Sequence, residues 1–149
     1  EVLAHFRAPM DPLGLKHALQ ASVMSFCDLN DVELAFDDQV PGLQLSVAQE
    51  FQLLRVVQEA LANIAKHSRA RHAWLTLAQR HGEVEVRVED DGAGLTRADT
   101  HDGLSHFGLD IMSQRARGLG GSLEVSPREC GGTRLRLRFP IEPVEGGAQ

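Results

Sequence analysis

The sequence predicts an α+β protein in which about three helices cover one face of a mixed, mostly antiparallel sheet, as a two-layer α/β sandwich. Segments with apolar residues at helical spacing follow segments in which every second residue is apolar. Two of the strand-like segments are separated only by a short turn, which favours antiparallel pairing. The 149 residues are enough for one domain with a proper core, and no internal repeat is present.

Composition is that of an ordinary globular protein. Hydrophobic residues make up 42% and charged residues 24% of the chain, which excludes disorder of the whole. The net charge of −6 has no basic stripe within it, so nucleic-acid binding has little support. Cys27 and Cys130 fit no metal or redox spacing, so we expect free thiols in a reducing compartment. No apolar run in the 149 residues approaches the ~20 residues that cross a bilayer, and we expect no signal-peptide segment within them.

The first half of the chain predicts a linker, two helices and a strand. Residues 1–12 end in a Pro-Met-Asp-Pro break and are expected to be the end of an upstream helix plus a linker. The chain has no initiator methionine, which suggests a piece of a longer protein. Residues 13–29 predict a helix, and residues 32–36 alternate like a strand with one buried side. Ser46 predicts the N-cap of a long helix, with Gln49 completing a capping box.

The second half predicts a hairpin, a helix, a second strand pair and a tail. The hairpin turns at a short glycine-containing loop, and two consecutive glycines end the helix. A polar stretch without a period separates the hairpin from the helix. The ranges are 72–79 and 83–89 for the hairpin, 95–107 for the polar stretch, 108–119 for the helix, 122–125 and 133–139 for the last strands, 13–140 for the domain and 141–149 for a mobile tail.

The long helix, within residues 46–68, has a polar stripe opposite its apolar side. Glu59 and Asn63 lie one turn apart on this stripe, although Asn is a mediocre helix former. A carboxylate and an amide oxygen at this spacing suit a magnesium ion or its waters. An ordinary solvated helix face is the alternative interpretation.

Glycines mark two further candidate sites. Asp90, followed by Gly92 and Gly94 directly after a strand, could accept a hydrogen bond from the exocyclic amine of adenine while the bare backbone lets the base approach. An ordinary Asp-Gly turn is the alternative. Gly108 opens a helix whose N-terminus could seat phosphates, or it is a plain helix start. Thr133 supplies one more hydroxyl near the sheet. Neither a P-loop nor a Gly-x-Gly-x-x-Gly motif occurs.

Four short motifs follow one another along the chain: Glu59-x-x-x-Asn63-x-x-Lys66-His67, Asp90-x-Gly92-x-Gly94, Phe107-Gly108-Leu109 with Met112 and Arg115-Ala116, and Gly131-Gly132-Thr133. In this order they resemble the N, G1, G2 and G3 boxes of histidine kinase ATP-binding domains, within the GHKL superfamily of gyrase, mismatch-repair ATPases and the heat-shock chaperone. The resemblance implies the Bergerat type of sandwich. The Lys-His-Ser sequence and the Gly-Leu-x-x-Met-x-x-Arg-Ala pattern are similar to the nitrate/nitrite sensor kinase branch.

The resemblance also implies roles for single residues. Glu59 would be catalytic, orienting or deprotonating the attacking group, and Asn63 would ligate magnesium that bridges the triphosphate. Asp90 would bind the adenine amine, and residues 95–107 would form a lid over the nucleotide. The residues expected to contact ATP or its magnesium are Asn63, Lys66, His67, Asp90, Gly92, Gly94, His106, Gly108, Leu109 and Thr133.

No histidine lies in a phosphoacceptor motif of the Glu-Leu-His-Asp kind, and the nearest candidate, His17, is expected to be an exposed helix residue. The leading hypothesis is therefore the catalytic domain of a sensor histidine kinase. It would transfer the γ-phosphoryl of ATP to a histidine on an upstream dimerisation domain, for relay to a response regulator. The whole protein would be a membrane-anchored homodimer with this domain in the cytoplasm. The alternatives are a non-catalytic ATP-dependent interaction module and a serine kinase of the anti-sigma type.

Overall fold

The computed structural model describes residues 13–94 and 108–142. The predicted linker, the predicted lid with His106 and most of the predicted tail lie outside the described residues. The elements follow the order that the sequence predicts. They are α2 (Leu15–Leu29), β1 (Glu33–Asp38), α3 (Val47–Asn63), the π-helical turn η1 (Ile64–Ser68), β2 (His72–Arg80), β3 (Glu83–Asp90), α5 (Leu109–Gly118), β4 (Ser122–Pro127) and β5 (Thr133–Pro140).

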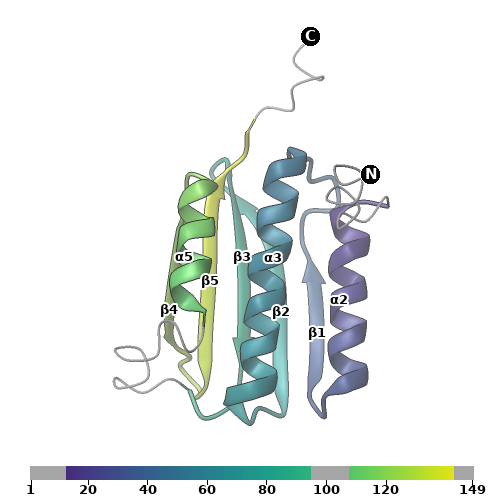
Figure 1. Ribbon diagram of the computed structural model, residues 1–149, viewed down its shortest axis with the longest axis vertical. Coiled ribbons are helices and arrows are strands. Elements are labelled where there is room, and N and C mark those ends of the chain that lie inside the picture. Colours follow the sequence, from purple (N-terminus) through teal and green to yellow (C-terminus); the bar gives the residue numbers. More distant parts are fainter. Residues whose placement is uncertain (1–12, 95–107, 143–149) are drawn as a thin grey trace, which may run out of the picture.

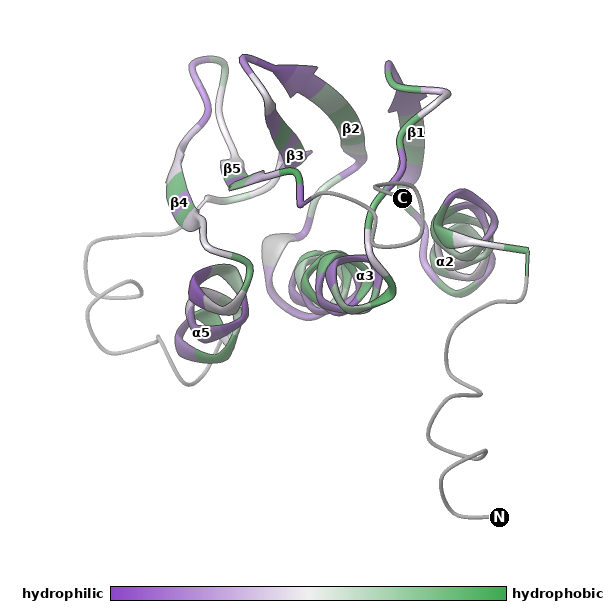
Figure 2. Cartoon of the chain, turned by 90° about the horizontal axis from the view of Figure 1, so that it is seen from above, coloured by the Kyte–Doolittle hydropathy of each residue, from purple (hydrophilic) through white to green (hydrophobic). Residues whose placement is uncertain are grey.

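The strands form one five-stranded sheet in the order β1-β2-β3-β5-β4. β1 runs parallel to β2, and every other neighbouring pair is antiparallel. Helices α2, α3 and α5 lie side by side on one face of the sheet (Figure 1), and the view from above shows that the described helices leave the other face uncovered (Figure 2). The predicted two-layer sandwich with a mixed, mostly antiparallel sheet is confirmed.

The core lies between the sheet and the apolar side of α3. Leu53, Val56 and Val57 of this helix are 0% exposed. They face strand residues that point to the same side because side chains alternate along a strand. The strand residues of the core include Leu75, Leu77, Val84, Val86, Leu137 and Phe139. Helix α3 is therefore fixed in position by burial.

The capping box predicted at the start of α3 is present. The hydroxyl of Ser46 accepts a hydrogen bond from the Gln49 N–H at 3.1 Å, and the Ser46 N–H donates to Oε1 of Gln49 at 3.4 Å. Gln49 is 2% exposed, and its Nε2 donates to the carbonyl oxygen of Pro140 at 2.9 Å. The same residue that caps α3 thus also ties the helix to the end of β5.

The structure differs from the sequence prediction at the ends of elements. The long helix is α-helical only to Asn63, and η1 follows until Arg69 takes a left-handed conformation with φ 57°. β1 is shifted towards Asp38 from the predicted 32–36, because parallel pairing with β2 sets its register.

Two residues that we expected in the mobile tail contact the folded body. The Ile141 N–H donates to the Gly82 carbonyl oxygen at 3.3 Å, and the Glu142 N–H donates to Gln49 Oε1 at 3.4 Å. The folded part therefore extends through Glu142. None of the helices in the described ranges combines the length and apolarity of a membrane span.

We expect Ser46→Ala to lower the free energy of unfolding by about 1 kcal/mol, because the first turn of α3 then lacks its side-chain acceptor. Urea denaturation followed by circular dichroism measures the change. Ser122→Ala, at an exposed position of β4, is the matched control and should stay within about 0.5 kcal/mol of the wild type. Equal stability of the two variants would contradict the role of the cap.

Candidate functional site

The elements that bear the predicted site residues meet at one end of the molecule. The end of α3 leads through η1 and residues 69–71 into β2, whose Ala73 pairs with Asp90 at the end of β3. Asp90 in turn pairs with Thr133 at the start of β5. In Figure 1 the end of α3, the end of β3 and the starts of β5 and α5 all lie towards the lower end of the molecule.

Glu59 lies on the side of α3 that faces α5. A Cβ atom added at Gly108, the N-cap of α5, would lie 2.8 Å from Oε2 of Glu59. Two α-helical turns before Glu59, Arg115 of α5 donates from Nη1 to Oε1 of Gln52 at 2.7 Å. The two helices are thus held together along this side, with the Glu59 carboxylate directly at the N-terminus of α5.

Two features favour glycine at position 108. Its φ of 68° is left-handed, which residues with a side chain adopt at a cost. In addition, a Cβ atom at this position would make the Glu59 side chain shift from its place beside the N-terminus of α5. The first turn of a helix presents unpaired N–H groups and the positive end of the helix dipole, so the start of α5 can attract anionic groups.

Asp90 is a buried carboxylate, 5% exposed. Its Oδ1 accepts a hydrogen bond from the Gly92 N–H at 2.8 Å, and no described residue donates to Oδ2. Burial raises the pKa of Asp90 above its ordinary value, although the bond from Gly92 acts in the opposite direction. A buried carboxylate with capacity for another hydrogen bond suits a ligand that donates one.

The backbone around Asp90 is packed as closely as glycine allows. A Cβ atom at Gly132 would overlap the carbonyl oxygen of Asp90, and one at Gly94 would lie 3.3 Å from the Gly132 carbonyl oxygen. We call this group, with Gly92 and Thr133, the Asp90 corner. The corner joins the predicted G1 and G3 motifs, which lie about forty positions apart in the sequence.

Asp91 has a role that sequence reasoning missed. Its Oδ1 accepts hydrogen bonds from the N–H groups of Arg71 and His72, each at 2.9 Å, and its Oδ2 lies 2.8 Å from Nδ1 of His72. The bond from the His72 N–H is the largest of the contributions that lower the pKa of Asp91 to about 2. The Asp-Asp-Gly sequence indicated a turn, but the groups that bond to Asp91 come from Arg71 and His72 at the start of β2.

The remaining predicted residues are placed as follows. Lys66 and His67 are exposed on η1, beyond the end of α3. Leu109 is 5% exposed and belongs to the hydrophobic core, so its side chain anchors the start of α5. His106 lies outside the described residues. A π-helical turn is a frequent feature of functional sites, and η1 directly follows Asn63.

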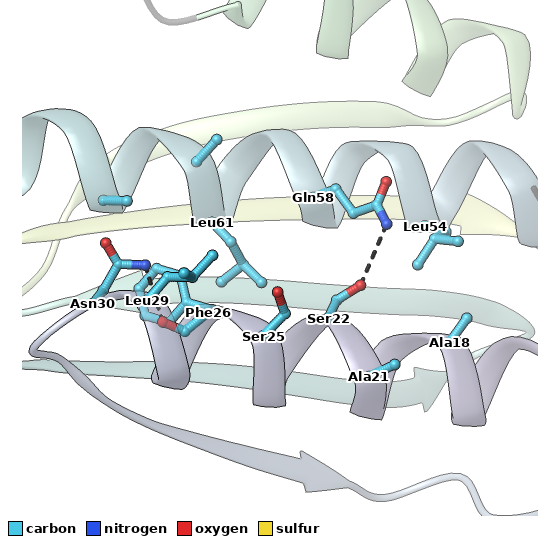
Figure 3. A pocket seen from close by; sticks show the side chains of 12 residues that line it. Ala18, Ala21, Ser22, Ser25, Phe26, Leu29, Asn30, Leu54, Gln58 and Leu61 are labelled. Carbon is cyan, nitrogen blue, oxygen red and sulfur yellow. Dashed lines mark hydrogen bonds between the residues drawn. The ribbon is translucent and has the colours of Figure 1, made fainter.

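A separate hollow of about 620 Å³ lies on the other side of α3, between α3 and α2. Figure 3 shows the hydrogen bond across it from Gln58 Nε2 to Ser22 Oγ, 3.3 Å long, with Phe26, Leu29 and Leu61 near by. None of the predicted ligand-binding residues lines this hollow. It is therefore distinct from the Asp90 corner.

No group of three His, Cys, Asp or Glu side chains able to hold a metal occurs in the part of the chain that the structure describes. Magnesium commonly takes only one or two protein ligands and completes its shell with waters and phosphate oxygens. The oxygen donors of Glu59 and Asn63 fit that chemistry.

The chain is similar to known proteins over most of its length. Residues 48–143 match the family model "Histidine kinase-, DNA gyrase B-, and HSP90-like ATPase". The sensor protein NarQ homolog of Haemophilus influenzae is 33% identical over 94% of this chain, and the nitrate/nitrite sensor protein NarX of Escherichia coli strain K12 is 34% identical over 93%. The chain spans only 24% and 23% of these two proteins. The sensor histidine kinase LiaS of Bacillus subtilis is 31% identical over 98% of this chain, which spans 40% of LiaS.

Solved structures share the fold. The ATP-binding domain of PrrB from Mycobacterium tuberculosis superposes with a TM-score of 0.69 at 24% identity, covering 85% of this chain and 93% of that domain. The histidine kinase domain of the blue-light-activated kinase EL346 from Erythrobacter litoralis gives a TM-score of 0.71 at 20% identity, covering 89% of this chain and 64% of that one. At these identities the likeness concerns the architecture.

We expect Asp90→Asn to stabilise the ligand-free chain at pH 7. Because folding raises the pKa of Asp90, the fold favours its protonated form. The associated stability is complete below pH about 4 and is lost as the pH rises through the folded pKa. Asparagine keeps an oxygen for the Gly92 N–H and carries no charge. Urea midpoints from pH 4 to 8 should show a gain that grows with pH.

Glu124→Gln, at an exposed carboxylate of β4, is the control for the charge change alone and should show no growing gain. A lower stability of Asp90→Asn than of the wild type at pH 7 would contradict this account of the buried carboxylate.

Proposed function

The chain belongs to the family of histidine kinase-, DNA gyrase B- and HSP90-like ATPases, and from this membership we propose that it is the catalytic ATP-binding domain of a two-component sensor histidine kinase. Its ATP would supply the γ-phosphoryl group to a histidine on a separate helical dimerisation domain. The observation on which the proposal rests is the meeting of the Asp90 corner, Glu59 and the N-terminus of α5 at one end of the sandwich. The named sensor kinases among the relatives favour this function over an anti-sigma serine kinase or a non-catalytic module.

The Asp90 corner is proposed to bind adenine. Its carboxylate would accept a hydrogen bond from the exocyclic amine, which guanine replaces by an acceptor oxygen. Gly92 and Gly94 leave the base room to approach the backbone, and the hydroxyl of Thr133 lies beside Asp90 in the strand register. A buried polar group left without its partner is costly, so such a site discriminates strongly against the wrong base.

The start of α5 and the end of α3 are proposed to bind the triphosphate. The N–H groups at Gly108 would meet phosphate oxygens, and the exposed Lys66 and His67 on η1 could reach others. Asn63 would hold magnesium, which supplies neutralisation of phosphate charge when it is bound. These roles are supported by the oxygen and nitrogen chemistry of the residues at this end.

The proposed chemistry is an in-line phosphoryl transfer. An imidazole nitrogen of the acceptor attacks the γ-phosphorus, the bond from that phosphorus to the bridging oxygen breaks, and ADP leaves. Glu59 would orient the imidazole or accept its proton. Phosphoryl transfer needs little covalent help from protein, so positioning and charge neutralisation account for most of the rate.

The whole protein is proposed to be a membrane-anchored homodimeric sensor that passes the phosphoryl group to a response regulator. The identities of 33% and 34% to NarQ and NarX proteins place nitrate or nitrite among the candidate signals. This domain would then lie in the cytoplasm, where ATP is available.

Calorimetric titration with ATP and magnesium tests the binding site. Asp90→Asn should weaken ATP binding at least about tenfold, because a charge-assisted hydrogen bond to the base is lost. Asn63→Ala should remove the dependence of ATP binding on magnesium. Glu124→Gln on the uncovered face is the matched control and should titrate like the wild type. Unchanged titrations of both site variants would refute the assignment.

Glu59→Gln separates binding from transfer. The variant should bind ATP with nearly wild-type affinity, because glutamine keeps the shape beside Gly108, but should transfer phosphate at least about a hundredfold more slowly. The assay mixes the 149-residue chain with labelled ATP and a histidine-bearing helical domain of a sensor kinase. Glu50→Gln on the same helix is the control, since Glu50 is in the first turn of α3. Undiminished transfer by Glu59→Gln would exclude the proposed role.

A further inference from the structure

The uncovered face of the sheet bears a compact group of side chains directly behind the Asp90 corner. Trp74 points to this face, because its neighbours Ala73 and Leu75 join the core on the other. The register places Glu89 beside Trp74. We call the group the rear cluster; its members are His72, Trp74, Glu89, Asp91 and Arg128.

Asp91, the first residue after β3, is hydrogen-bonded to the start of β2. Its N–H donates to the His72 carbonyl oxygen at 3.1 Å, in addition to the three contacts of its carboxylate with Arg71 and His72. Asp91 is bonded directly to Asp90, so these contacts also fix the peptide group that joins the two residues. The position of Asp90 therefore depends on its neighbour Asp91, whose carboxylate contacts Arg71 and His72, while the carboxylate of Asp90 accepts from Gly92.

Trp74 lies between His72, the partner of Asp91, and Arg128, which precedes β5. The His72 ring stacks on Trp74 with a centroid distance of 6.3 Å and an interplanar angle of 21°. On the same indole, the guanidinium carbon of Arg128 lies 4.3 Å from the ring centroid, a cation–π contact. Nε of Arg128 also donates to Glu89 Oε1 at 3.2 Å.

Arg128 in turn holds the turn between β4 and β5. Its backbone N–H donates to the Gly132 carbonyl oxygen at 3.0 Å, and its Nη1 donates to the Gly131 carbonyl oxygen at 3.2 Å. Gly132 packs against the carbonyl group of Asp90 and the Cα of Asp91. The contacts therefore close a ring from Asp91 through Trp74 and Arg128 back to Asp90.

We propose that the rear cluster, whose member Asp91 directly follows Asp90, is the positioning scaffold of the Asp90 corner and sets the selectivity of the site for adenine without touching the nucleotide. The inference rests on the proposed function for the identity of the ligand. The physical basis of the proposal is the spacing of two loops, one after β3 and one before β5. Their separation must stay fixed if a flat base is to fit between the glycine backbones and the Asp90 carboxylate. Side chains on the uncovered face of the sheet would thereby contribute to recognition of a base that binds at the Asp90 corner.

The test compares ATP and GTP binding, both with magnesium, to the 149-residue chain. Asp91→Ala should weaken ATP binding about tenfold and leave GTP binding unchanged, so the preference for ATP falls by the same factor. Asp91→Asn keeps an oxygen for the two N–H groups and should restore most of the preference. His72→Ala, which removes only the ring contacts, should lower the preference about threefold. Glu124→Ala, on the same face but paired with Arg136, is the control and should change neither affinity.

A merely structural role would lower both affinities together, so an equal loss of ATP and GTP binding in Asp91→Ala overturns the proposal, as does unchanged ATP binding. Hydrogen exchange of the Gly92 amide, which donates to Asp90, tests the positioning without nucleotide. Exchange should be faster in Asp91→Ala and in His72→Ala than in Glu124→Ala, and unchanged protection contradicts the inference. A wild-type chain that fails to prefer ATP refutes the proposed function instead, and the exchange result still decides whether Asp91 positions the corner.

Discussion

The burial of α3 against the sheet fixes the positions of the other elements around it. Leu53, Val56 and Val57 are fully excluded from solvent, and each such side chain contributes about 1.5–3 kcal/mol of hydrophobic stabilisation. Because this side of the helix is fixed, the side that bears Glu59 is turned towards α5. The catalytic carboxylate of the proposed kinase thus owes its place to apolar residues on the opposite side of the same helix.

Asp90 illustrates a conflict between stability and function. Burial disfavours its ionised form, while the bond from the Gly92 N–H compensates only in part. A ligand that donates a hydrogen bond to Asp90 would offset part of the cost of burying this carboxylate, and that gain would favour binding. Neighbouring Asp91 is the opposite case, because hydrogen bonds from the start of β2 lower its pKa to about 2 and it stabilises the fold as an anion.

The uncovered face of the sheet is held by charged side chains in place of a second layer of helices. Arg87 pairs in register with Arg136, and these like charges are offset by Glu85 and Glu124 through ion pairs. The rear cluster, which includes the ion pair of Arg128 with Glu89, belongs to the same layer of charged side chains.

The order of the elements, the two-layer class, the capping box at Ser46 and the four motifs could be predicted from the sequence. These follow from periodicity, turn chemistry and local hydrogen bonds, which are encoded within a few positions of one another. The sequence did not determine the π-helical turn after Asn63 or the extension of the fold to Glu142. The contact of Gly108 with Glu59 and that of Gly132 with Asp90 depend on three-dimensional packing, so the sequence did not predict them. The partners of Asp91 were likewise invisible, because strand register brings together groups whose separation in the sequence carries no local signal.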